Sequence, residues 1–179
     1  SSASTALKVG VGAQEETGWC RGVAAVAVGD LPALEAARAG HSNAALALCP
    51  WLAKHARMEE KDKARGRTLL ALASAAGAAT LVRRVVEEFG GKLGVADDEG
   101  KGLVWIAAKE GHAEVVRVLR KLGANVETPN KYGYTPVCIA ASNGHVEVVR
   151  VLRKLGANVE TPKQDGATPV FMAAQNGHV

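Results

Sequence analysis

The sequence is poor in aromatic residues and in cysteine, and it has no long apolar run. Aromatic residues make up 4% of the 179 residues, a composition that favours close packing of small side chains. No stretch approaches the roughly 18 consecutive apolar residues that a membrane span requires. Residues 1–28 also lack a basic start followed by a continuous apolar block, so they are not predicted to be a signal peptide.

The cysteines are too few and too far apart to predict a disulfide framework. Cys20, Cys49 and Cys138 are odd in number and include no CxxC motif. Such cysteines are typical of reduced thiols. We therefore predict a cytoplasmic protein, with the nucleus as the alternative. The net charge of +4 is modest and does not by itself indicate a nucleic-acid or membrane partner.

What the sequence does contain is a repeat. Residues 111–129 recur as residues 144–162, 33 positions later, and only Ala113 differs, being replaced by Val146. A fixed period of this length predicts a stacked array, because one such unit cannot bury its apolar face alone. An array offers a long surface and no enclosed cavity, which favours binding over catalysis. We predict no enzymatic activity and no cofactor.

Each repeat carries the pattern of two helices. In residues 114–122 the apolar side chains fall on one stripe, and Gly123 follows at the position of a C-terminal cap. Residues 135–143 predict a shorter first helix, with Thr135 as its N-cap and Pro136 in its first turn. Between units, a short segment containing glycine predicts a turn.

The motif that recurs resembles the ankyrin repeat. It is Thr-Pro-Val-x-x-Ala-Ala-x-x-Gly-His-x-Glu-Val-Val-x-x-Leu-x-x-x-Gly-Ala-Asn, spaced at 33 residues and strongest over residues 97–179. The resemblance implies an all-α solenoid of stacked helix-turn-helix units with β-turn fingers. The histidine that this family usually has after Thr-Pro-Leu is replaced by Trp105, Cys138 and Phe171. Because its hydrogen bond to threonine is lost, we expect those turns to be less rigid.

The repeat also predicts how the chain is divided. Residues 1–25 form a lead of undetermined role, and the units follow at 26–62 (degenerate), 63–96, 97–129, 130–162 and 163–179 (truncated). An alternative phase places the two helices of the first unit at 23–28 and 31–39. Both ends of the chain look cut, and the missing second helix of the last unit is expected to leave apolar surface exposed. We expect a monomeric array or part of a longer chain.

Residues that could carry chemistry have more ordinary explanations. His112, His145 and His178 recur at one position, but stacking separates successive copies by roughly 10 Å. Zinc needs all its ligands at about 2 Å from one ion, so we expect these histidines to bond nearby backbone instead. Cys138 is expected in the core, and the acidic residues 97–99 are expected to face water. No catalytic, cofactor-binding or metal-binding residue is predicted.

A basic stripe on the second helices favours an alternative function, the binding of a polyanion such as nucleic acid or anionic lipid. Against it, Glu114 and Glu147 interrupt the stripe, and no aromatic residues interleave with it as stacking platforms. This basic ridge consists of Arg117, Arg120, Lys121, Arg150, Arg153 and Lys154, with Arg83 and Arg84 as an extension.

The units differ most in the segment before the first helix and at the exposed end of that helix. The copied second helices suit packing on one another, so function is sought where the copies differ. In the ankyrin family these positions line a concave groove that contacts partner proteins. Tyrosine is a suitable anchor there, since it buries a large area for little lost entropy. The residues predicted to contact a partner are Asp98, Glu99, Lys101, Lys109, Glu110, Lys131, Tyr132, Tyr134, Ser142, Asn143, Gln164, Asp165 and Ala167.

We therefore predict a non-enzymatic scaffold that binds a partner protein through its fingers and first helices. A third possibility is that the array regulates an enzyme domain outside the present sequence. The partner itself cannot be identified from the fold, because one fold serves many unrelated interactions.

Overall fold

The computed structural model describes residues 65–178, together with residues 37, 40–43, 45, 59 and 61. The predicted lead and most of the degenerate unit, including the question of its phase, lie outside the described residues. The described part contains seven helices and one isolated bridge, between Ala96 and Gly102, but no strand. The helices are α4 (Leu69–Ala75), α5 (Ala79–Phe89), α6 (Leu103–Lys109), α7 (Ala113–Lys121), α8 (Pro136–Ser142), α9 (Val146–Lys154) and α10 (Pro169–Gln175).

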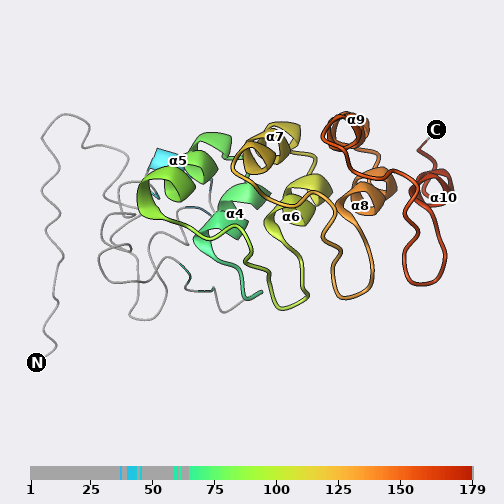
Figure 1. The fold of residues 1–179 in the computed structure, drawn as a ribbon, viewed down its shortest axis with the longest axis horizontal. Helices are drawn as coiled ribbons and strands as arrows, with labels where there is room; N and C mark the ends of the chain where they lie inside the picture. Colours follow the sequence, from blue (N-terminus) through green and yellow to red (C-terminus); the bar gives the residue numbers. More distant parts are fainter. Residues whose placement is uncertain are drawn as a thin grey trace, which may run out of the picture.

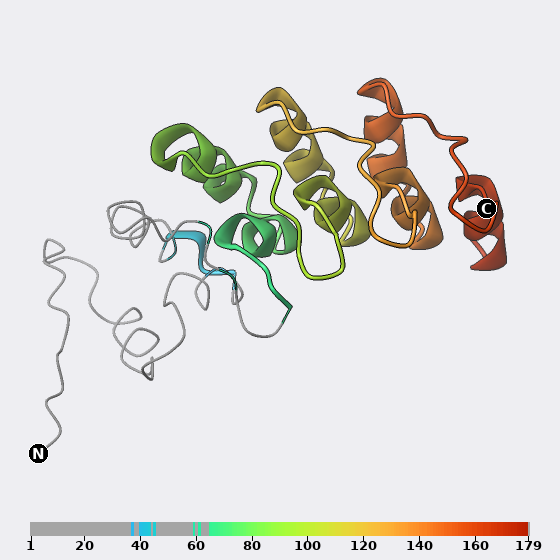
Figure 2. The same cartoon turned by 60° about the horizontal axis from the view of Figure 1, so that its bottom comes forward.

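The helices form two parallel layers. One layer contains α4, α6, α8 and α10, and each helix packs on the next; the other contains α5, α7 and α9. The loops between units project away from both layers on one side, as the lower part of Figure 1 shows, and Figure 2 shows the two layers from another direction. The predicted all-α solenoid of stacked helix pairs is therefore confirmed.

The first helix of a unit begins where its sequence predicts. The side-chain oxygen of Thr135 accepts a hydrogen bond from the Cys138 N–H, and Thr168 does the same for Phe171. Proline follows each threonine in the first turn, where a missing N–H costs nothing because that group has no partner inside the helix. In α6 the cap position is occupied by Gly102, which has no side chain to accept such a bond.

The second helices bury the predicted stripe and end at the predicted glycines. Val115, Leu119 and Leu152 are at most 1% exposed, whereas four other members of the stripe, Val118, Leu122, Val149 and Leu155, are partly buried. The chain leaves both helices through glycine with φ of 99° at Gly123 and 91° at Gly156, a region that residues with a side chain rarely adopt.

The apolar layer between the helices thins at α10. Val170 is 74% exposed and Phe171 is 57% exposed, whereas their counterparts Val137 and Cys138 in α8 are at most 1% exposed. Exposed apolar surface thus lies on the last helix itself, whereas we expected it on the preceding unit, where Val146 of α9 is 58% exposed. The expectation that Cys138 belongs to the core is confirmed.

The recurring histidines bond backbone, as predicted, but in the preceding unit. Nε2 of His112 lies 2.9 Å from the Ala75 carbonyl oxygen, and Nε2 of His145 lies 2.9 Å from that of Lys109. The His112 ring lies so close to Gly77 that a Cβ at Gly77 would stand 2.8 Å from it. These histidines therefore join one unit to the next.

The expected loosening of the turns at Trp105 and Cys138 needs correction. The indole N–H of Trp105 donates to the Tyr134 carbonyl oxygen at 2.9 Å, and the Cys138 thiol donates to the Thr161 carbonyl oxygen at 3.6 Å. The Tyr134 acceptor belongs to the following unit, whereas Thr161 lies in the same unit as Cys138, just before the next finger. Trp105 and Cys138 therefore supply donors of their own that hold the adjoining loops.

Candidate functional site

The candidate surface is built on three loops, which we call the fingers, at residues 97–101, 130–134 and 163–167. Each finger is closed by a backbone hydrogen bond from its first N–H to its last carbonyl, at 3.1, 3.0 and 3.0 Å respectively. A second bond joins the fourth N–H to the first carbonyl, at 2.9, 3.0 and 2.9 Å. The three backbones are thus the same turn, whatever side chains they carry.

The first side chain of a finger has a structural role. Oδ1 of Asp97 accepts from the N–H groups of Glu99 and Lys101 at 3.0 and 2.9 Å. Oδ1 of Asn130 makes the same two bonds in the next finger, both at 3.0 Å. Asp97 and Asn130 are each 7% exposed, and Oδ2 of Asp97 lies 3.7 Å from Nε of the buried Arg67. The expectation that Asp97 faces water is therefore wrong, because its carboxylate holds the turn.

Neighbouring fingers touch near their tips. The Asp98 N–H donates to the Arg65 carbonyl oxygen at 3.4 Å, and the Lys131 N–H donates to that of Glu99 at 3.3 Å. The close contact between the middle finger and the third finger depends on glycine at position 133, because a Cβ there would stand 2.7 Å from Cγ of Gln164. The structure therefore brings the predicted tip residues of successive fingers side by side.

The thirteen predicted contact residues differ in accessibility. Tyr132 is an exposed large apolar side chain, 52% accessible, at the tip of the middle finger. Nζ of Lys131 lies 5.1 Å from the centre of its ring. The exposed residues are Asp98, Glu99, Glu110, Lys131, Tyr132, Asn143, Gln164 and Asp165. The half-buried residues are Lys101, Lys109, Tyr134, Ser142 and Ala167.

Two of the half-buried residues are occupied by contacts inside the chain. Tyr134 packs against the core, its hydroxyl oxygen lies 3.2 Å from Nζ of Lys163, and that Nζ lies 4.9 Å from the ring centre. Lys101 forms an ion pair with Glu99, and its Nζ lies 5.1 Å from the ring centre of Trp105. Sequence comparison of the units does not single out Lys163, whose partner Tyr134 belongs to the preceding finger.

The ends of the first helices are also tied together. The side-chain amide of Asn143 donates to the Lys109 carbonyl oxygen at 2.9 Å. The amide of Asn176 donates to the carbonyl oxygen and to the hydroxyl of Ser142, at 2.7 and 2.9 Å. Lys109 forms an ion pair with Glu110 at 3.3 Å. The side chains at these positions therefore hold successive first helices together, in addition to any contact with a partner.

Ion pairs favour the charged form of two finger carboxylates, those of Glu99 and Asp165. The hydrogen-bonded ion pair with Lys101 lowers the pKa of Glu99, and the corresponding pair with Lys163 lowers the pKa of Asp165. Asp165 in turn raises the pKa of Lys163. Asp98 lies 3.5 Å from Nζ of Lys61. The tips thus present an acidic first finger beside a middle finger with Lys131 and Tyr132.

The basic ridge is partly neutralised. Nη2 of Arg117 lies 2.7 Å from Oε1 of Glu147, and Nη1 lies 3.1 Å from Oε2 of Glu114. Arg84, the predicted extension, pairs with Glu88 at 2.7 Å. The guanidinium that lies at the centre of the predicted ridge is therefore shared between two carboxylates.

Within the described residues, no three histidine, cysteine, aspartate or glutamate side chains lie close enough together to hold a metal ion. No helix in the same part of the chain is long and apolar enough to cross a membrane. The family model described as Ankyrin repeats (many copies) matches residues 104–153 and 137–179. No curated protein shows significant similarity to the chain.

Proposed function

The chain is an ankyrin-repeat protein over residues 104–179, and from this premise we propose that it binds a partner protein through the tips of its fingers. Ankyrin repeats are in general protein–protein interaction modules and are typically non-catalytic. Our proposal goes beyond this general role in two ways. It specifies the finger tips as the binding surface, and it assigns this chain a non-enzymatic role. A cytoplasmic or nuclear location remains a prediction.

The observation that carries the proposal is Tyr132. Tyr134 and Trp105, two residues of similar size nearby, are packed and hydrogen-bonded within the chain. Tyr132 instead projects from a rigid turn with 52% of its surface exposed. A tyrosine on a rigid turn offers a large contact area at a low entropic cost, which is why such residues anchor interfaces.

Charge around Tyr132 supports selectivity for one partner over another. Lys131 stands beside it, and the Glu99 carbonyl that bonds the Lys131 N–H belongs to the acidic finger. Charged groups around a buried anchor chiefly set specificity and association rate. The expected partner surface has an apolar recess for Tyr132 with acidic groups towards Lys131.

The test compares the proteins captured by the wild-type chain with those captured by Tyr132→Ala. Tyr134 stays intact, because its removal would disturb the core. We expect the Tyr132 variant to lose roughly 30-fold in affinity for the partner, the effect typical of an interface anchor. Arg150→Ala on the basic ridge is the matched control and should bind normally.

The opposite result would favour polyanion binding. In that case Tyr132→Ala would keep every partner, Arg150→Ala would lose binding, and the affinity would fall steeply with salt. The ion pairs of Arg117 make this the weaker alternative. Regulation of an enzyme domain outside the present sequence stays a prediction, tested by the flanking gene sequence.

A further inference from the structure

A glutamate from one unit bonds the backbone of the next. Oε1 of Glu127 accepts from the Asn158 N–H at 2.8 Å. Oε1 of Glu59 accepts from the Lys92 N–H at 3.1 Å. Lys92 and Asn158 both stand two residues after the positive-φ glycine that ends a second helix. At two of the junctions, the equivalent N–H is thus bonded to a glutamate of the preceding unit, although Glu59 and Glu127 stand two positions apart within the repeat.

The junction between these two lacks the glutamate. The residue that corresponds to Glu127, one period earlier, is Gly94. The residue that corresponds to Lys92 and Asn158 is Asn125, and its N–H has no acceptor within the described part of the chain. A Cβ at Gly94 would meet nothing within 4 Å, so the place of the side chain is open.

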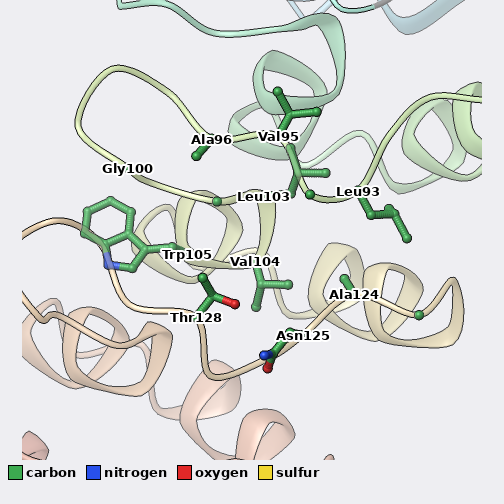
Figure 3. A pocket seen from close by; sticks show the side chains of 13 residues that line it. Leu93, Val95, Ala96, Gly100, Leu103, Val104, Trp105, Ala124, Asn125 and Thr128 are labelled. Carbon is green, nitrogen blue, oxygen red and sulfur yellow. The ribbon is translucent and has the colours of Figure 1, made fainter.

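A pocket of about 200 Å³ lies at this junction, with Gly94 and Asn125 in its lining (Figure 3). Its other walls are mainly apolar and include Leu93, Val95 and Val104. Thr128 also lines the pocket and adds a hydroxyl to it (Figure 3). The pocket therefore has mainly apolar walls and includes Asn125, the residue whose counterparts Lys92 and Asn158 have their N–H groups bonded to a carboxylate.

The charge at the pocket suits an anion. None of the described residues that line it is acidic. Nη1 of Arg120 lies 3.5 Å from the carbonyl oxygen of Ala124, which is part of the lining, and Arg120 is exposed. A cationic group at the edge of a partly apolar pocket strengthens a hydrogen bond between an N–H and a carboxylate.

We propose that this pocket binds a glutamate side chain of a partner protein, whose carboxylate accepts the Asn125 N–H. The partner thereby supplies the group that the chain itself supplies through Glu59 and Glu127. The site goes beyond the finger-tip surface around Tyr132, and either proposal can fail while the other stands.

The probe is a peptide with the sequence that surrounds Glu127, the residue that bonds the Asn158 N–H at the next junction. It is the capped pentapeptide acetyl-Ala-Asn-Val-Glu-Thr-amide, the sequence around Glu127, and its matched control carries Gln in place of Glu. The full chain, labelled with ¹⁵N, is titrated with each peptide while the Asn125 amide resonance is followed. We expect a downfield shift with the Glu peptide and about tenfold weaker binding of the Gln peptide, since charge-assisted bonds are the stronger ones.

Two variants of the chain complete the test. Gly94→Glu should place an internal carboxylate in the pocket, shift the Asn125 amide without peptide, and abolish the response to the Glu peptide. Gly94 does not have the left-handed backbone that would strain a side chain. Gly94→Ala is the control, and it should keep most of the response, which shows that loss in Gly94→Glu comes from the carboxylate.

Three outcomes would overturn the proposal. The first is an Asn125 resonance that does not move at any peptide concentration. The second is an equal response to the Glu and Gln peptides, which would mean that the carboxylate is not recognised. The third is an equal response to acetate alone, which would mean that the pocket takes any carboxylate and does not select a glutamate side chain.

Discussion

The fingers at residues 97–101 and 130–134 have the same backbone but opposite chemistry at their tips. Asp97 and Asn130 use the same oxygen to bond the same two N–H groups of the turn. Beyond that residue, one finger continues with two acids and the other with Lys131 and Tyr132. In these two fingers one buried side chain holds the turn and the tip varies, while the third finger forms the same backbone turn with Lys163 in that position.

The largest expected effect comes from removing that buried side chain. Asp97→Ala should lower the free energy of unfolding by about 3 kcal/mol, because two turn bonds and the carboxylate beside Arg67 are lost together. Asn130→Ala loses only the turn bonds and should cost about 2 kcal/mol. Urea denaturation of both variants gives the difference. Equal losses would mean that the charge pair adds nothing to the first finger.

A smaller effect is expected from the contact that joins α6 to the finger at residues 130–134. Trp105→Phe keeps most of the apolar contact but removes the indole N–H that bonds the Tyr134 carbonyl. The cost should be about 1 kcal/mol, the net value of one hydrogen bond, because the Tyr134 carbonyl keeps its bond from the Asn130 N–H. Cys138→Ala is the matched change one unit later and should cost less through the weak thiol bond, although it also leaves a small cavity. Thermal unfolding monitored by circular dichroism measures both, and hydrogen exchange at the Asn130 amide reports whether the loosening is local.

The smallest expected effect is a pH dependence of the thermal stability that comes from Glu99 in the first finger. The ion pair with Lys101 lowers the pKa of Glu99 from the ordinary value of 4.5, so the charged form is favoured in the folded chain. Its contribution is complete above about pH 5 and is lost as the pH falls through the lowered pKa of the folded state. Thermal melts of the wild type and Glu99→Gln should therefore differ at neutral pH and converge in acid. A difference that persists unchanged to pH 3 would exclude the ion pair as its source.

Much of the fold follows from local sequence. Thr135 and Pro136 predict the start of a first helix, and the glycines at 123 and 156 predict the end of a second one, because these effects involve neighbours within one turn. The apolar stripe predicts which face is buried. The period also predicts exposed apolar surface near the last unit, but it does not identify Val170 and Phe171 as the residues that carry it.

The candidate site could be predicted only in part. The differing tips are visible in the aligned units, and Tyr132 remains the principal candidate. Tyr134, chosen by the same argument, is instead packed under Lys163. The two residues are only two positions apart, but one faces solvent and the other faces the next finger. Which of them is free depends on a contact across units, which the local sequence does not contain.

By itself, the sequence determined the repeating unit: its period, its two helices, their caps and the buried stripe. These features depend on side chains a few positions apart, whose relation is the same in every helix. The tertiary structure decided what happens between units: that Asp97 is buried, that Lys163 covers Tyr134, and that Gly94 and Asn125 line one pocket. Those contacts join residues about one period apart, and they form only when stacking brings successive units within hydrogen-bonding distance.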